Sequence, residues 1–158
     1  MSQFPVPQSP RGSSDGQFNS KKLSTWLLIS AGAYLVMNLL HVIARTTETY
    51  QTNVTSAVNE LMGESGVTMT PEPAVGVTNL LMWAVVLGLY ALINAFLRQG
   101  KNWARVTGIV LACLGSAAAL FGMFNILFYG AFGIVVALGV VAFIAVNVVW
   151  IVAAVRGR

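Results

Sequence analysis

The chain has 158 residues, of which 56% are hydrophobic and only 9% are charged. A soluble domain carries about 25% charged residues, so this composition excludes an ordinary soluble fold. Four long runs occupy 23–44, 75–97, 103–129 and 131–155 and carry no charge except Arg105 near the start of the third; each reaches the roughly 20 apolar residues that a transmembrane helix needs. We therefore predict an all-α integral membrane protein, an antiparallel four-helix bundle that fills residues 21–158.

The net charge of +4 and the isoelectric point near 9.6 do not indicate nucleic-acid binding, because the basic residues are segregated. Eight of the nine fall in three short segments: Arg11, Lys21 and Lys22; Arg98, Lys101 and Arg105; Arg156 and Arg158. The remaining segment, 45–74, holds four glutamates and one arginine. Lys and Arg mark the cytoplasmic side of membrane proteins. This pattern predicts four crossings with the N- and C-termini both in the cytoplasm.

Two segments outside the apolar runs have distinct compositions. Residues 1–20 contain three of the five prolines together with Gly, Ser and Gln, which predicts a disordered cytoplasmic tail. The outer loop, 45–74, places Tyr50, Val54 and Val58 at helical spacing between polar residues. This spacing predicts an amphipathic helix, which either continues the helix over 23–44 or lies on the outer membrane surface.

The first run carries a polar stripe. Tyr34, Asn38, His41 and Arg45 fall within about 60° of one another on a helix. Arg45 at the boundary can extend its charge into water, whereas the deeper Asn38 needs an internal partner. Asn125, in the third run, is a candidate for that role. The favoured interpretation is a contact between helices; the alternative is an outward-facing polar pocket for a lipid headgroup or a quinone-like ring.

The third run carries a stripe of small residues at gaps of four and three. Its members are Gly108, Ala112, Gly115, Ala119 and Gly122. In lipid, small residues let helix backbones approach closely and pack through dispersion forces. We expect this stripe to form an internal helix contact in preference to a dimer interface.

Groups that support chemistry are scarce in the four runs. They contain no Asp or Glu, so an ion or proton relay lacks its usual carboxylate. The single histidine and the single cysteine, Cys113, form no metal or haem ligand set. We predict that the protein is not an enzyme and needs no metal or other cofactor.

The turn between the second and third runs reads "LRQGKNWARVTGIVLA", at 97–112. It resembles uncharacterised small four-helix membrane proteins of actinobacteria, in which a Gly–basic–Asn–Trp–Ala–Arg turn follows a Pro/Gly/Ser-rich N-terminal tail. The resemblance implies the four-span topology and a bacterial plasma membrane. Within the turn, Lys101, Trp103 and Arg105 are typical anchors at the inner membrane interface.

These observations favour a non-catalytic membrane protein. The first hypothesis is an accessory or scaffold subunit of a larger envelope or respiratory complex, which contacts another membrane protein through helix faces or the loop 45–74. The alternative is a small transporter or a lipid- or quinone-binding protein that uses the polar stripe of the first helix. The expected surroundings are the lipid bilayer in both cases, with no nucleic acid.

Overall fold

The computed structural model describes residues 14–62 and 75–156, with side chains from residue 21 onward. Its elements are α1 (Ser14–Arg45), α2 (Glu48–Met62), α3 (Val77–Arg98), α4 (Asn102–Gly122), the 3₁₀ helix η1 (Met123–Phe132) and α5 (Gly133–Arg156). No β-strand occurs within these ranges, so the predicted all-α class is confirmed for them. The predicted tail up to residue 13 and the part of the outer loop at 63–74 lie outside the described residues.

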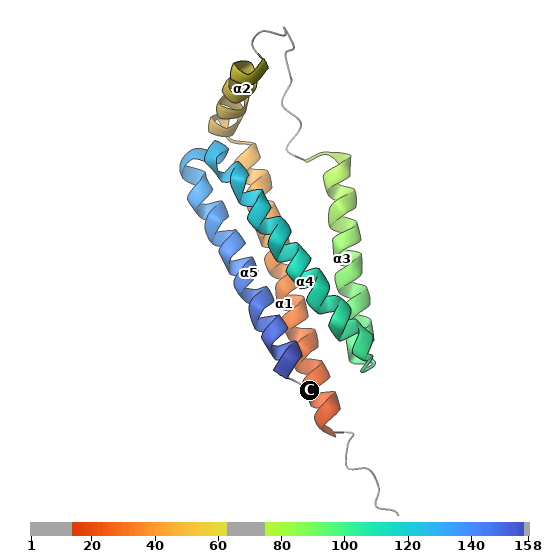
Figure 1. The fold of residues 1–158 in the computed structure, drawn as a ribbon. Coiled ribbons are helices and arrows are strands. Elements are labelled where there is room, and N and C mark those ends of the chain that lie inside the picture. The colour runs from red at the N-terminus through yellow and green to blue at the C-terminus, as the bar shows by residue number, and fades with distance from the viewer. Residues whose placement is uncertain (1–13, 63–74, 157–158) are drawn as a thin grey trace, which may run out of the picture.

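Three helical stretches are long and apolar enough to cross a membrane: Lys21–Arg45, Val77–Arg98 and Asn102–Arg156. The third contains 55 residues and includes α4, η1 and α5. It reverses direction near Gly130, so that α4 and α5 lie side by side (Figure 1). The coarse prediction of membrane-spanning helices is therefore supported by length and composition, and the count of four crossings remains a prediction.

The reversal depends on Gly130, whose backbone has φ 56° and ψ −137°. A Cβ atom there would lie 2.8 Å from Cγ2 of Thr49, on the neighbouring α2. Glycine is the residue that accepts both this backbone conformation and this close approach. The hairpin between α4 and α5 is thus specified by one residue.

α1 begins at Ser14 and so extends into the segment that was expected to be a disordered tail. The last proline of that segment is Pro10, and no proline interrupts the chain from there to the end of α1. At the other end, the hydroxyls of Thr46 and Thr47 donate to the carbonyls of Ile43 and Ala44, both at 2.7 Å. These bonds compete with helical ones, and α2 starts as a separate helix.

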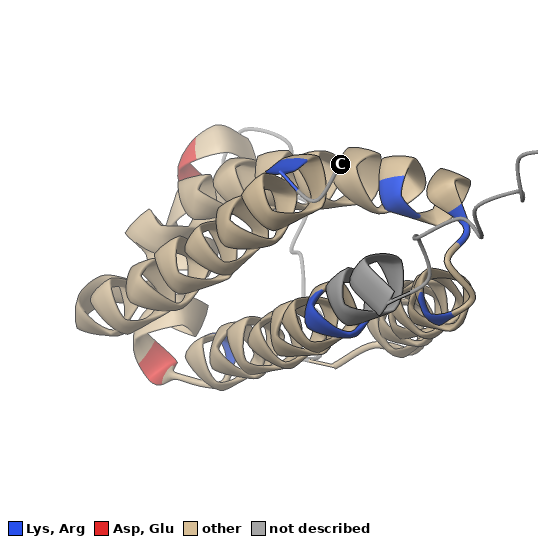
Figure 2. Ribbon diagram, turned by 90° about the horizontal axis from the view of Figure 1, so that it is seen from below, with Lys and Arg blue, Asp and Glu red and all other residues tan. Residues whose placement is uncertain are grey.

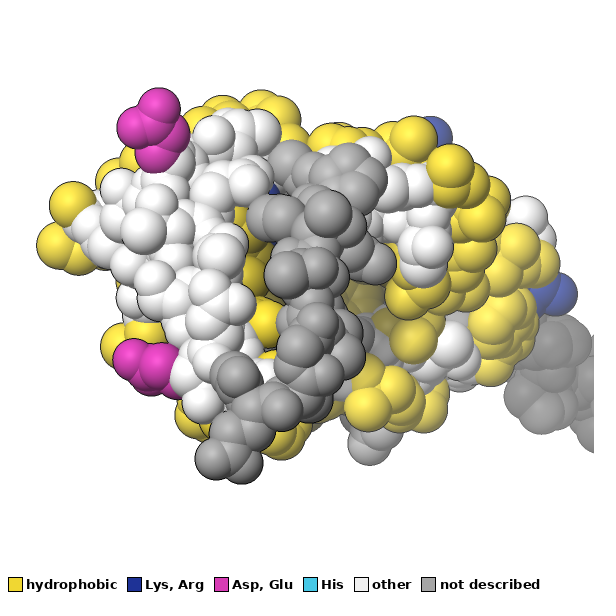
Figure 3. All heavy atoms as spheres, turned by 90° about the horizontal axis from the view of Figure 1, so that it is seen from above, with side chains coloured by type: hydrophobic (Ala, Val, Ile, Leu, Met, Phe, Trp, Pro, Cys, Tyr) yellow, Lys and Arg dark blue, Asp and Glu magenta, His cyan; other side chains and the backbone are white. Residues whose placement is uncertain are grey.

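The helices have two distinct ends (Figure 1). The start of α1, the last turn of α5 and the connection between α3 and α4 lie at one end, here called the terminal end; α2 lies at the other, the α2 end. Six described basic residues belong to the terminal end (Figure 2): Lys21, Lys22, Arg98, Lys101, Arg105 and Arg156. The two acidic residues whose side chains are described, Glu48 and Glu60, lie on α2 (Figure 3).

α1 packs against α3 and α5, and α4 packs against the same two helices. The buried cluster at the terminal end draws residues from all four, with Leu27, Ile93, Ala104 and Trp150 among them. The two clusters nearer the α2 end contain no residue of α3. α3 and α4 meet at their connection and diverge toward the α2 end (Figure 1).

Replacing Gly130 by alanine should destabilise the protein by about 1–3 kcal/mol, because the new Cβ forces an unfavourable φ and contacts Thr49. Thermal unfolding in detergent, followed by circular dichroism, measures the change. Gly88→Ala is the matched control, since a Cβ at Gly88 has no atom within 4 Å; it should gain roughly 0.5–1 kcal/mol in helix propensity. Equal stability of the two variants would contradict the role assigned to Gly130.

Candidate binding cavity

An elongated cavity of about 490 Å³ lies between α1, α3, α4 and α5. Its lining runs from Leu27 to Arg45 along α1 and from Gly108 to Gly122 along α4. At about 1.5 Å per residue, these stretches measure roughly 27 Å and 21 Å. The cavity therefore follows the long axis of the helices from near the terminal end to the α2 end.

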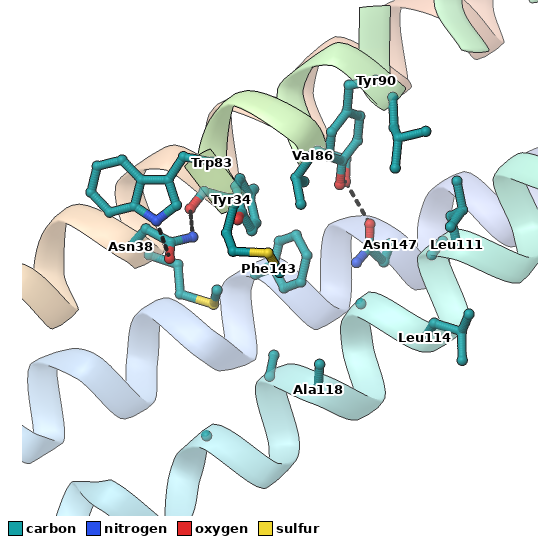
Figure 4. Close-up of a pocket in the computed structure, with 18 of the residues that line it drawn as sticks. Tyr34, Asn38, Trp83, Val86, Tyr90, Leu111, Leu114, Ala118, Phe143 and Asn147 are labelled. Atoms are coloured by element: carbon teal, nitrogen blue, oxygen red, sulfur yellow. Dashed lines mark hydrogen bonds between the residues drawn. The ribbon is translucent and has the colours of Figure 1, made fainter. Parts of the chain in front are cut away.

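A hydrogen-bonded group around Asn147, which is 1% exposed, lies in the cavity wall in the half nearer the terminal end. Its Nδ2 donates to Ser116 Oγ at 3.1 Å, and its Oδ1 accepts from Ser30 Oγ at 2.5 Å. The Ser30 hydroxyl has a single proton, so the 3.0 Å contact with Tyr90 Oη is a bond donated by Tyr90. Tyr90 and Asn147 approach from facing helices in Figure 4. This network joins α5 to α1 and α4, and α1 to α3.

The wall between α1 and α3 is held by a second hydrogen bond. Trp83 Nε1 donates to Asn38 Oδ1 at 3.1 Å, and Asn38 Nδ2 donates to the carbonyl of Tyr34 at 2.8 Å (Figure 4). Both ends of the Asn38 amide are thus satisfied without Asn125. Asn125 belongs to η1, is exposed and does not line the cavity. The sequence argument assumed one continuous α-helix over 103–129, whereas the tighter 3₁₀ turn places Asn125 on another face.

The cavity opens between α3 and α4. Met82 and Leu89 of α3 and Leu114 of α4 line it, yet they are 58%, 39% and 61% exposed. The only described residues that α3 buries are Ile93 and Leu97, near its terminal end. We call the gap flanked by Met82, Leu89 and Leu114 the mouth. It faces sideways from the helix axes, and it is apolar.

The remaining polar residues of the first-helix stripe lie at the α2 end of the cavity. His41 and Arg45 both line it. Nδ1 of His41 is 2.9 Å from the Met37 carbonyl, and the His41 ring meets Tyr129 edge to face with centroids 5.9 Å apart. The structure therefore places Asn38, His41 and Arg45 on one cavity, with Asn38 midway and Arg45 at the end.

The small-residue stripe of α4 faces the interior. All five of its members line the cavity. A Cβ on Gly108 would lie 2.4 Å from Cη2 of Trp150, and one on Gly115 would lie 3.8 Å from Cζ of Phe143. The stripe thus admits Trp150 and Phe143 of α5, whereas a Cβ at Gly122 would have no atom within 4 Å.

The expected interface anchors lie at the connection of α3 and α4. Trp103 is 46% exposed, and its ring packs on Phe96 with centroids 4.7 Å apart. The Lys101 amide donates to the Phe96 carbonyl at 3.1 Å, while Arg105 is half-buried one turn into α4. These three residues lie away from the cavity.

Sequence reasoning did not assign Ser30, Trp83, Tyr90 or Ser116 to the site. A serine within an apolar run has no periodic signature, because it can bond its own helix backbone as well as a neighbour. Trp83 and Tyr90 each have one polar atom on a large ring, and such an atom usually has a hydrogen-bond partner when the ring is buried. This is the one sequence feature that could have assigned them to the site. Among the described residues, no group of three or more His, Cys, Asp or Glu side chains is placed to hold a metal.

Replacing Asn147 by leucine should lower stability by about 1–2 kcal/mol, because hydrogen bonds to Ser30 and Ser116 are lost and bonds between membrane helices average roughly 0.6 kcal/mol each. Unfolding in mixed micelles of increasing denaturing detergent measures this. Asn125→Leu is the control, since the Asn125 side chain is exposed and makes no hydrogen bond to a described residue. A loss no larger than that of the control would show that the network does not hold the helices together.

Comparison of the chain with protein-family models, with curated proteins and with solved structures gives no significant match. The geometry of the cavity is therefore the basis for assigning a function to the chain.

Proposed function

We propose that this chain is a multi-pass membrane protein that binds an apolar or amphiphilic membrane molecule, such as a lipid, in the cavity between α1, α3, α4 and α5. The observation that carries the proposal is the sideways mouth. It is flanked by Met82, Leu89 and Leu114, on two helical stretches that are apolar enough to lie in a bilayer. A molecule already dissolved in the bilayer can enter there without passing through water.

The proposed setting is a bacterial plasma membrane crossed four times, with both termini in the cytoplasm. Two observations support it. The six basic residues of the terminal end lie together, as expected for a cytoplasmic side, and the reversal near Gly130 divides the 55-residue stretch into two antiparallel helices. Each of these helices exceeds about 20 residues, the length that spans a hydrocarbon core.

The lining favours a lipid over an ion or a soluble metabolite. Leu, Val, Met, Ala, Gly and aromatic residues make up most of it, and Arg45 is its one charged member among the described residues. A cation pathway normally uses carboxylates. Ligand cavities of this kind are mainly apolar and contain a few polar groups that orient the ligand. Here His41 and Arg45 are placed to do so, because Asn38 and Trp83 already bond each other.

Filling the cavity from the α4 side should displace the ligand. Ala118 lines the cavity and is exposed (Figure 4), so Ala118→Phe can occupy the space without a buried clash. We expect it to reduce binding of a photoactivatable phospholipid, measured as crosslinked protein in proteoliposomes, by about tenfold or more, equivalent to about 1.4 kcal/mol.

Ala117→Phe is the matched control, because Ala117 is exposed on the same helix but does not line the cavity. It should crosslink as the unmodified protein does. If both variants retain full crosslinking, the lipid is bound elsewhere on the surface and the proposal is wrong.

A second candidate function is that of an accessory or scaffold subunit of a larger envelope or respiratory complex. The observation that favours it is α2, in which no residue is buried and in which Leu61 is 87% exposed. An apolar side chain displayed on a short helix at the α2 end is available to another protein.

One experiment tests both the topology and this second function. A membrane-impermeant thiol reagent carrying a photocrosslinker is applied to intact cells with Leu61→Cys in a Cys113→Ala background. We expect labelling at position 61 and none in the control Lys101→Cys, which lies at the opposite end. Capture of one defined membrane protein would establish the accessory role; labelling without capture would remove it; labelling at Lys101→Cys would contradict the proposed topology.

A further inference from the structure

We propose that the α2 end of the cavity is a subsite for an anionic headgroup, in which Arg45 binds a phosphate or similar oxyanion while the hydrocarbon tail lies between α3 and α4. This inference deepens the proposed function and rests on it. It names the lipid class: an anionic phospholipid in preference to a zwitterionic one.

The first observation is a pair of buried polar atoms with no partner. Nε of Arg45 and the hydroxyl of Tyr129 are both buried, and neither has a hydrogen-bond partner among the described residues. The Tyr129 side chain is 1% exposed and is not itself part of the cavity lining, but its hydroxyl lies close to the side chain of Arg45, which is. A buried polar atom normally finds a partner. The Tyr129 hydroxyl can accept from the guanidinium, but its own proton has no acceptor among the described residues, and an oxyanion bound at Arg45 supplies one.

The second observation is the position of Arg45 relative to the other charges. Of the seven described basic residues, the other six lie at the terminal end. The positive-inside rule accounts for those six but not for Arg45, which lies at the α2 end and lines the cavity. No described carboxylate forms an ion pair with it. A guanidinium presents donors in a planar fork that matches phosphate and carboxylate oxygens.

The surrounding residues hold Tyr129 in place. The His41 ring packs edge to face on it, and the Tyr50 ring lies with its centroid 5.2 Å away. Tyr129 also belongs to the buried cluster that contains Ala44 and Val136. The hydroxyl is therefore fixed before any ligand arrives. Preorganised donors lose little freedom on binding, which favours affinity and specificity.

The shape of the cavity assigns the anion to a lipid instead of to a free ion. From Arg45 the lining continues through Asn38 to Val86, Leu111 and Phe143 without another charged described residue. A free phosphate would use only the charged end and leave this apolar length empty. An anionic phospholipid occupies both parts.

The test compares phosphatidylglycerol and phosphatidylcholine with identical acyl chains, bound to the full chain and measured by native mass spectrometry. We expect the unmodified protein to bind phosphatidylglycerol about tenfold more tightly than phosphatidylcholine. A hydrogen bond to a charged group strengthens binding by roughly a factor of ten or more. Arg45→Gln should lower the affinity for phosphatidylglycerol more than that for phosphatidylcholine and so reduce the preference, because both headgroups carry a phosphate but only phosphatidylglycerol has a net negative charge. Tyr129→Phe, which preserves the ring packing, should reduce the preference in the same direction.

Lys101→Gln is the control for net charge, since it removes one positive charge at the opposite end and should retain the preference. Equal affinities in the unmodified protein, or an undiminished preference in Arg45→Gln, would overturn the headgroup assignment. The variant Ala118→Phe separates this assignment from the proposed function. If the headgroup assignment fails but Ala118→Phe no longer binds either lipid, the cavity still binds lipid and the proposed function stands. If Ala118→Phe binds both lipids fully, the proposed function is refuted. Inorganic phosphate alone, if it raised the melting temperature as much as phosphatidylglycerol in an Arg45-dependent manner, would reassign the subsite to a free anion.

Discussion

The buried amide of Asn147 is the contact on which the helix arrangement depends. Helices in lipid gain little from burying apolar surface, because the surroundings are as apolar as their neighbours; close packing and hydrogen bonds between helices hold them together. Asn147 bonds α1 through Ser30 and α4 through Ser116, and Ser30 accepts from Tyr90 of α3. One side chain of α5 thus bonds two of the other long helices directly and is connected to the third, α3, through Ser30, next to the apolar cluster of the terminal end.

The position of this network explains why a cavity exists. α3 is fixed by its buried Ile93 and Leu97 and by the Tyr90 contact, all in its half nearest the terminal end. Toward the α2 end its one described polar contact with another helix is the bond from Trp83 to Asn38. α4, meanwhile, is held by α5 along the small-residue stripe. One wall of the cavity therefore follows α1 and the other follows α4, and the two separate because nothing large fills the space beside the glycines and alanines.

The sequence predicted what depends on composition and on single residues. The apolar runs predicted the long helices to within a few residues at most of their ends, and the one residue between the third and fourth runs, Gly130, is where the chain reverses. It also put Asn38, His41 and Arg45 on one stripe. It did not predict the partner of Asn38, because pairing between helices depends on how each one is rotated. The 3₁₀ helix η1 places Asn125 on a face away from Asn38, and Trp83 is the residue that hydrogen-bonds Asn38 instead.

The role proposed for Arg45 depends on a neighbour that is distant from it in the sequence. From the sequence alone, an arginine at the end of a membrane helix needs no explanation, since its long side chain can reach water. A tyrosine that is 1% exposed has no such freedom, and its unpaired hydroxyl lies beside that same arginine. Tyr129 comes from η1, 84 positions further along the chain, so no local pattern could associate the two. It is the burial of Tyr129, and not the charge of Arg45 alone, that supports the proposed role of this membrane-interface residue in binding an anion.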